Sequence, residues 1–192
     1  MNDMNDKTLG RGTLAVHAGV EPDPTTGAIM TPVYMTSTYV QDGVGNHKGY
    51  EYSRTHNPTR TALEQAFATL EHGTQGLAFA SGLAAMDTVL KTLQPGDEVI
   101  STNDLYGGSY RLFTTVFAHY GIRFHFVDLS DLNAVNATLN DATRLIWVET
   151  PTNPMMQITD IEAVAKAIAH HPAKMVVDNT FASPMLQNPL DL

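Results

Sequence analysis

The chain has 192 residues, of which 43% are hydrophobic and 16% are charged, and a formal net charge of −9. This composition supports one sizeable core and argues against disorder. The excess of acidic residues leaves no basic stripe for nucleic acid or an anionic membrane, and the chain has no cysteine for a disulfide, a thiolate metal site or a nucleophile. The polar N-terminus has no apolar signal core and no apolar run approaches the roughly 20 residues of a membrane span, so we expect a cytoplasmic protein.

Residues 1–58 are irregular. Gly, Pro and Thr recur along this segment, and neither the helical nor the strand period is sustained. We therefore predict an N-terminal arm that has no core of its own and packs on something else, such as a second subunit.

From residue 59 onward, segments of helical and of strand pattern alternate. Helices are predicted at 61–71, 82–93, 109–120, 130–139 and 159–170, and strands at 77–80, 97–101, 122–128, 144–150 and 174–178. Ser130 is expected to cap the helix that follows it, and Thr159 with Glu162 is expected to form a capping box. The alternation of mostly apolar strands with helices predicts an α/β domain with a parallel sheet over residues 59–192.

Ligands of open α/β sheets bind beyond the carboxyl ends of the strands, so the loops there hold the candidate residues. Ser81 and Gly82 stand between a predicted strand and a predicted helix, where backbone N–H groups and the helix dipole favour a phosphate. Ser81 is equally explained as an N-cap and Gly82 as a tight-packing residue. On these residues alone the simpler explanation is favoured.

Two further loops offer an aromatic ring and an amide. Tyr106 precedes two glycines after the next strand, where its ring could stack on a planar cofactor or pack beneath a loop. Asn153 lies between two prolines and could donate to a ligand oxygen, although a turn residue is the better explanation for it alone.

The last predicted strand ends in a carboxylate. Asp178 is costly to bury unless it meets a positive partner, which could be a protonated ring nitrogen, a neighbouring arginine, or the backbone of the next turn. Thr180 follows two residues later, on the same side of an extended chain. In the arm, Tyr52 and Arg54 have the same spacing and could contact a phosphate, or could be a half-buried tyrosine and a solvated arginine. The eight histidines form no helical pair backed by a carboxylate, so no metal site is predicted.

Taken together, these residues would supply a phosphate site, a stacking ring, an amide donor, a carboxylate and an Arg/Tyr pair. One cofactor combines a phosphate, a planar ring, a phenolic oxygen and a pyridine nitrogen. The set therefore points to pyridoxal phosphate.

Five segments resemble one family in their order and spacing: YEYSRTHNPTR (50–60), ASGLAAM (80–86), NDLYGGSYRLF (103–113), ETPTNPM (149–155) and VVDNTFASPMLQNPL (176–190). They are similar to the cystathionine γ-synthase and γ-lyase family of pyridoxal-phosphate enzymes of cysteine and methionine metabolism. The resemblance covers the chain from about Thr13. It implies the aspartate-aminotransferase-like large domain of fold type I, preceded by an N-terminal arm and followed by a smaller C-terminal domain.

The resemblance also implies roles for single residues. Ser81, Gly82 and Leu83 would hold the cofactor phosphate, the latter two through backbone N–H groups. Tyr106 would stack on the pyridine ring, and Asn153 would contact its phenolic oxygen.

The remaining implied roles concern the ring nitrogen and the subunit contact. Asp178 would pair with the protonated pyridine nitrogen, and Thr180 would lie against the ring. Tyr52 and Arg54 would reach the phosphate of the neighbouring subunit in a homotetramer built from dimers that share active sites.

The family carries its cofactor on a Schiff-base lysine in a Ser-x-Thr-Lys segment shortly after the Asp-Asn-Thr stretch. No lysine of this chain follows Asp178 or lies in such a segment. We therefore expect residues 59–192 to be an incomplete large domain without that catalytic group, in the N-terminal portion of an enzyme for β/γ elimination or replacement on a sulfur amino acid: cystathionine, cysteine or activated homoserine.

Two alternatives remain. The chain could be a truncated, non-catalytic remnant that binds a partner subunit or a phosphate ligand without turnover, and the absent lysine favours that reading. A Rossmann-type nucleotide binder is disfavoured because no G-x-G-x-x-G follows the first predicted strand. Whether the reaction is that of a lyase or a synthase stays open.

Overall fold

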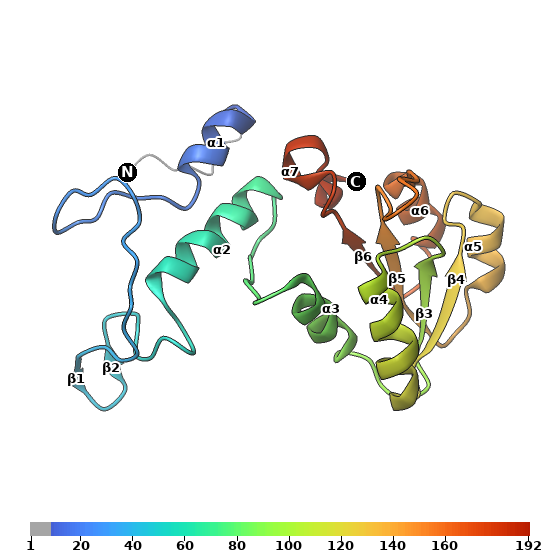
Figure 1. The fold of residues 1–192 in the computed structure, drawn as a ribbon, viewed down its shortest axis with the longest axis horizontal. Coiled ribbons are helices and arrows are strands. Elements are labelled where there is room, and N and C mark those ends of the chain that lie inside the picture. Colours follow the sequence, from blue (N-terminus) through green and yellow to red (C-terminus); the bar gives the residue numbers. More distant parts are fainter. Residues whose placement is uncertain (1–8) are drawn as a thin grey trace. The chain divides into compact units, whose positions relative to one another are not determined.

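The computed structural model describes residues 9–192. The chain divides into two compact units, Met1–Ala78 and Phe79–Leu192, and each has its own set of elements (Figure 1). The division falls after the first long helix, so by compactness this helix groups with the arm predicted over residues 1–58.

The first unit is built around one helix. Its elements are α1 (Arg11–His17), the short antiparallel strands β1 (Gln41–Gly43) and β2 (Asn46–His47), and α2 (Pro58–Leu70). Asn57 caps α2 by accepting the Thr59 N–H at 2.9 Å, and Pro58 occupies the first turn, where no N–H is needed. A Cβ on Gly19, which has a φ of +70°, would lie 2.3 Å from the Ala62 carbonyl oxygen, so the chain approaches α2 too closely for any other residue.

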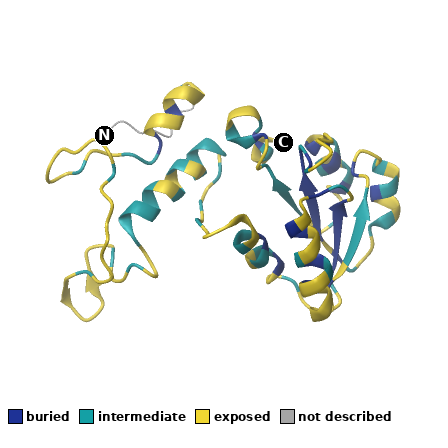
Figure 2. Cartoon of the chain, in the orientation of Figure 1, coloured by how far each residue is buried: buried dark blue, intermediate teal, exposed yellow. Residues whose placement is uncertain are grey.

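This unit has almost no core. Leu14 and Ala18 are its only buried residues in the described part (Figure 2). The apolar side chains of Leu63 and Phe67 in α2 are 47% and 51% exposed. The described residues of this unit thus bury few apolar side chains among themselves.

The second unit is a parallel sheet between helices. In chain order it contains α3 (Gly82–Leu90), β3 (Glu98–Thr102), α4 (Gly107–Arg111), β4 (Arg123–Val127), α5 (Leu132–Thr138), β5 (Thr143–Glu149), α6 (Ile161–Ile168), β6 (Lys174–Asp178) and α7 (Ser183–Leu186). The strand order is β4-β3-β5-β6 and every pairing is parallel. The α/β class predicted from the sequence is therefore confirmed.

Each face of the sheet packs on its own hydrophobic cluster. Alternate residues of the central strands point to opposite faces, so Val99 and Trp147 pack with Met86 of α3 and with Phe113. On the other face Ile146 packs with α5 and α6. Strand β3 is buried along its whole length, as Figure 2 shows, because both faces are covered.

Several predicted details are wrong. Residues 77–80 are not a strand: Leu77 is 69% exposed, and no described strand pairs with this segment. The 109–120 helix exists but changes pitch, from α4 through a π-helical turn (Leu112–Val116) to a 3₁₀ turn (Phe117–Tyr120), and it ends at Gly121 with a φ of 81°.

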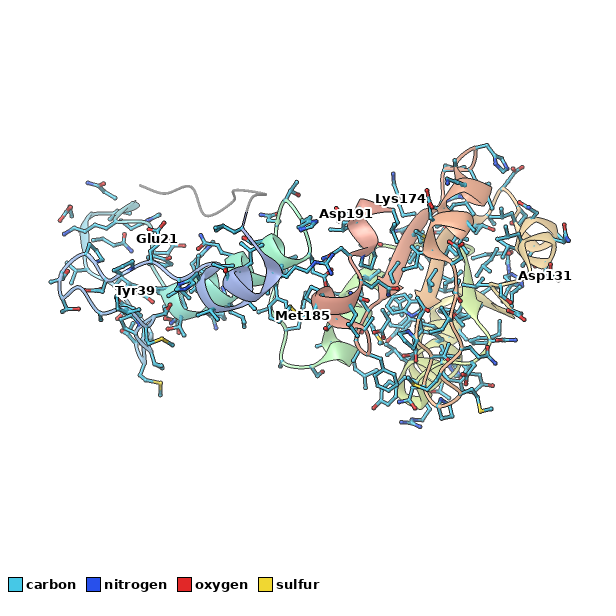
Figure 3. The ribbon with its side chains drawn as sticks, turned by 90° about the horizontal axis from the view of Figure 1, so that it is seen from above. Glu21, Tyr39, Asp131, Lys174, Met185 and Asp191 are labelled. Carbon is cyan, nitrogen blue, oxygen red and sulfur yellow. The ribbon has the colours of Figure 1, made fainter. Side chains whose placement is uncertain are left out.

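Both predicted helix caps are displaced by one residue. Asp131 rather than Ser130 caps α5, accepting the Asn133 N–H at 3.0 Å; it lies at the start of that helix in Figure 3. Asp160 caps α6 through the Ala163 N–H at 2.9 Å, so the capping box of Thr159 and Glu162 does not form. In both cases an Asp, which is also a strong capping residue, stands one position further along and accepts the backbone N–H groups of the first turn.

Candidate functional site

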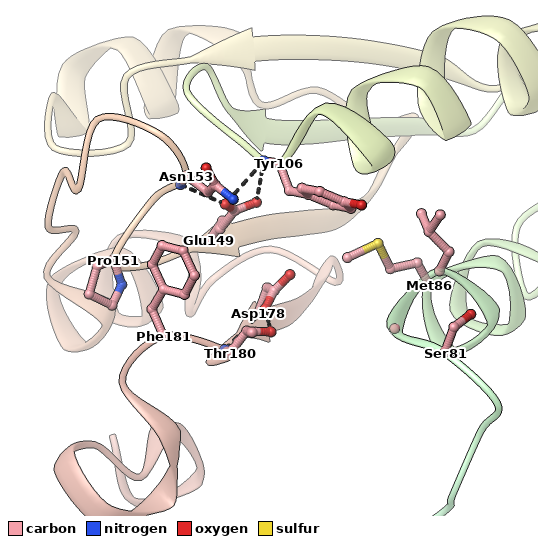
Figure 4. Close-up of a pocket in the computed structure, with 11 residues that line it drawn as sticks. Ser81, Met86, Tyr106, Glu149, Pro151, Asn153, Asp178, Thr180 and Phe181 are labelled. Atoms are coloured by element: carbon pink, nitrogen blue, oxygen red, sulfur yellow. Dashed lines mark hydrogen bonds between the residues drawn. The ribbon is translucent and has the colours of Figure 1, made fainter.

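A cavity of about 320 Å³ opens at the carboxyl ends of β5 and β6, facing the start of α3 (Figure 4). All residues around it belong to the second unit. Its lining consists of Ser81, Gly82, Leu83, Met86, Tyr106, Glu149, Pro151, Asn153, Asp178, Thr180 and Phe181. Every candidate residue predicted within this unit therefore lies around one cavity, where the parallel topology brings the loops together.

The start of α3 forms one wall. Ser81 caps the helix, its Oγ accepting the Ala84 N–H at 3.1 Å, which is the simpler of the two predicted roles. The Ser81 hydroxyl keeps its proton for a further acceptor. The N–H groups of Gly82 and Leu83 have no hydrogen-bond partner in the described part of the chain, and a Cβ built on Gly82 would meet nothing within 4 Å. An anion can approach these donors at the positive end of the helix.

The ring of Tyr106 extends from the start of α4 across the cavity (Figure 4). It is 42% exposed, so one face is free for a planar ligand. Its placement needs a glycine two residues on: a Cβ on Gly108 would lie 2.3 Å from the Tyr106 ring.

Asp178 lies at the end of β6, opposite α3. Its Oδ1 accepts the Thr180 N–H at 3.1 Å and the Thr180 hydroxyl proton, so the turn role foreseen for this carboxylate is present. In the described residues its Oδ2 has no hydrogen bond and no arginine pairs with it. The free oxygen can accept a hydrogen bond from a protonated, cationic group of a ligand.

The loop that carries Asn153 contains two cis X-Pro bonds, Thr150-Pro151 and Asn153-Pro154. It is fastened to the loop after β3, because Asp104 accepts the Thr152 hydroxyl proton and the Met155 N–H, the latter at 3.1 Å. The side-chain amide of Asn153 has no hydrogen-bond partner in the described part of the chain and remains available to a ligand.

Sequence reasoning missed a central residue of this site. Glu149, the last residue of β5, is only 4% exposed. Its carboxylate accepts the Tyr106 N–H at 2.9 Å and 3.1 Å on its two oxygens, and the Asn153 N–H at 2.9 Å (Figure 4). Burial raises the pKa of Glu149, the two N–H groups oppose that rise, and the negative charges of Asp178 and Asp104 add to it. Its partners are backbone N–H groups, and one of them, that of Tyr106, is 43 residues away in the sequence, so no sequence motif marks Glu149 as part of the site.

Tyr52 and Arg54 lie in the other unit, outside the one that holds the cavity. The Arg54 guanidinium carbon is 5.0 Å from the centre of the Tyr52 ring, so the two side chains share one side of the chain as predicted. Arg60 donates to the Arg54 and Thr55 carbonyl oxygens and holds this turn against the start of α2.

Other classes of site find little support. The described residues contain no group of three or more His, Asp or Glu side chains arranged for a metal ion. Within the same residues, no helix has the length and apolar character needed to cross a membrane.

The cavity of this α/β domain combines a helix start open to an anion, an aromatic ring and a free carboxylate opposite. These groups suit a phosphorylated, planar, cationic ligand. The sequence model of the Cys/Met metabolism PLP-dependent enzymes matches residues 12–192. The chain belongs to that family, whose cofactor is pyridoxal phosphate.

Curated relatives agree with this assignment. A probable cystathionine gamma-synthase of Herpetosiphon aurantiacus is 51% identical over 183 residues, which are 95% of this chain and 57% of the relative. The cystathionine gamma-synthase of Mycobacterium leprae is 52% identical and matches over 95% of this chain and 48% of its own length. A cystathionine beta-lyase of Coxiella burnetii is 49% identical, over 100% of this chain and 50% of the relative. The chain thus spans about half the length of these relatives.

Solved structures share the fold. The metB protein of Corynebacterium glutamicum superposes with a TM-score of 0.94 at 52% identity, covering 98% of this chain and 49% of that one. A cystathionine gamma-lyase of Lactobacillus plantarum, complexed with L-serine, has a TM-score of 0.92 at 50% identity, over 95% of this chain and 48% of that one. The large-domain fold of pyridoxal-phosphate enzymes, expected from the sequence, is confirmed.

Proposed function

We propose that the native protein containing these residues is a pyridoxal-phosphate enzyme of the cystathionine γ-lyase or γ-synthase type. It acts on a sulfur amino acid: cystathionine, cysteine or an activated homoserine. The observation that carries the proposal is the cavity, with donors at the start of α3 on one wall and the free oxygen of Asp178 on the other. The substrate class is supported by the names of the relatives, although this chain covers only about half the length of each relative.

The residues take separate parts in binding. The hydroxyl of Ser81 and the N–H groups of Gly82 and Leu83 hold the phosphate. Tyr106 stacks on the ring, and Asn153 donates to the ring oxygen.

Asp178 keeps the proton on the ring nitrogen, and Thr180 orients that carboxylate through two hydrogen bonds to Oδ1. When bound, the cofactor supplies an electron sink for the substrate α-carbon. The chain's own contribution is to bind and orient the ring and to hold the nitrogen protonated. Tyr52 and Arg54 bind the phosphate of a neighbouring subunit in a homo-oligomer.

The test is made on the purified native protein. We expect a visible absorbance band from bound pyridoxal phosphate, together with cystathionine cleavage or synthesis. Asp178→Ala should weaken cofactor binding at least about tenfold, since it removes a charge-assisted hydrogen bond. Native protein that never binds the cofactor would contradict the proposal.

A second candidate is cofactor binding without turnover. Cofactor binding together with no detectable product from cystathionine, cysteine or activated homoserine would select this candidate.

A further inference from the structure

The bridging carboxylate of Glu149 occupies an unusual environment. It is almost fully buried and has no cationic partner among the described residues; the charged groups that face it, Asp104 and Asp178, are both negative. Asp178 is also its register partner across the β5–β6 pairing. A buried charge in such a place costs stability unless hydrogen bonds compensate its loss of hydration.

Those hydrogen bonds all go to the two loops that border the cavity. Both Glu149 oxygens accept the Tyr106 N–H, and one of them also accepts the Asn153 N–H. These hydrogen bonds require both side-chain oxygens of residue 149 to act as acceptors, as they do in a carboxylate. A protonated carboxyl or a glutamine would place a donor against an N–H group.

The ring of Tyr106 is constrained from a second direction. Gly108 lies against it so closely that a Cβ there would be 2.3 Å from the ring. The main chain of Tyr106 is therefore held by Glu149, and its ring rests on Gly108. Both contacts restrict the movement of the Tyr106 side chain, which lines the cavity.

We propose that Glu149 is a positioning residue for the cofactor. Its carboxylate fixes the loops of Tyr106 and Asn153, so that the Tyr106 ring and the Asn153 side-chain amide are both placed to contact the cofactor. This inference rests on the proposed function. Glu149 itself acts through Tyr106 and Asn153. Its loss should therefore change how the cofactor is held more than whether the domain folds.

The experiment compares Glu149→Gln with Glu98→Gln in the native protein. Glu98 is also a buried glutamate with several hydrogen bonds, but it stands at the start of β3, at the opposite end of the sheet from the cavity. Binding of pyridoxal 5′-phosphate is titrated by absorbance, and the visible circular dichroism of the bound cofactor reports how its ring is held.

We expect Glu149→Gln to raise the dissociation constant for pyridoxal phosphate about tenfold or more and to reduce the visible dichroism, because a buried N–H loses its acceptor. Glu98→Gln should lower the unfolding midpoint and leave both cofactor readouts unchanged. Wild-type affinity and dichroism in a folded Glu149→Gln protein would overturn the inference.

If Glu149→Gln does not fold, Glu149→Asp takes its place. This variant keeps the charge but is too short to reach both loops, so an intermediate loss of affinity is expected. Unchanged affinity would again overturn the positioning role. Absence of saturable binding in the wild-type protein would instead refute the proposed function, and the inference with it.

Discussion

Asp178 and Glu149 lie opposite each other on the paired strands β6 and β5, but the groups around their carboxylates differ. Glu149 is buried and uses its oxygens on backbone N–H groups of the chain. Asp178 is partly exposed, its Oδ1 accepts two hydrogen bonds from Thr180, and its Oδ2 has no partner among the described residues, so it is available to a ligand. The donors around a carboxylate at the carboxyl end of a strand thus decide whether it binds the chain's own backbone or remains available to a ligand.

Glu98 is, like Glu149, a buried carboxylate, and it makes a testable contribution to stability. Its oxygens accept from Asn140, Arg123 and His125, and the Asn140 amide is the largest cause that lowers its pKa, to about 2 from the usual 4.5. A lowered folded-state pKa stabilises the protein above the unfolded-state value of 4.5, and this stability is lost as the pH falls toward about 2.

We predict that Glu98→Gln lowers the free energy of unfolding at pH 7 by on the order of 2–3 kcal/mol, since donors lose a charged acceptor. The difference from wild type should shrink as the pH falls from about 4.5 toward about 2, because over that range the carboxylate of the unfolded wild-type chain takes up a proton before that of the folded protein does. Urea unfolding of the native protein at a series of pH values measures both. An equal deficit at every pH would contradict the role of the charge.

At the scale of elements, the caps give the next test. Asp160 caps α6, whereas Glu162 makes only an exposed pair with Lys166 one turn later. Asp160→Ala should destabilise the protein by about 1 kcal/mol, and Glu162→Ala by no more than about 0.5 kcal/mol. Thermal unfolding of the two variants measures the order. A larger loss from Glu162→Ala would mean that a capping box does form.

The sequence predicted the elements with strong periodicity, because apolar residues at strand and helix spacing are the ones that face the two cores. It missed the caps by one residue because Ser130 stands beside Asp131 and Thr159 beside Asp160, all of them capping types. It misplaced a strand at 77–80 because a strand depends on a neighbour that local pattern does not reveal.

The candidate site was predictable where single side chains lie at a helix start, in the loops after strands or at the end of a strand. Ser81, Tyr106, Asn153 and Asp178 all line the cavity. Glu149 and Gly108 were missed because they act through backbone donors and through the absence of a side chain. Contacts of this kind arise only when the loops after β3 and β5 are brought together by the sheet.

At the scale of the whole molecule, the first unit raises the question of assembly. It has little core and exposes large apolar side chains, among them Met35 at 93% and Val40 at 85%. Surfaces of this kind usually pack against another part of the protein or another copy of it. We propose that Tyr52 and Arg54 complete the site of a neighbouring subunit.

Mixing two variants tests this arrangement. Arg54→Ala and Asp178→Ala should each have greatly reduced activity alone. If sites are shared, hybrids of the two restore about a quarter of the wild-type sites in a randomly mixed population of dimers, because one site of each hybrid carries both defects and the other carries none. Co-expression followed by an activity assay measures the recovery. No recovery would place both residues in the site of their own chain.

A crystal structure of the native protein with pyridoxal phosphate would show directly whether the cofactor binds as we propose. We expect the phosphate of the cofactor at the N–H groups of Gly82 and Leu83 and its pyridine ring against Tyr106. The ring nitrogen should lie within hydrogen-bond distance of the free oxygen of Asp178. A cofactor bound elsewhere, or one whose ring nitrogen faces away from Asp178, would contradict it.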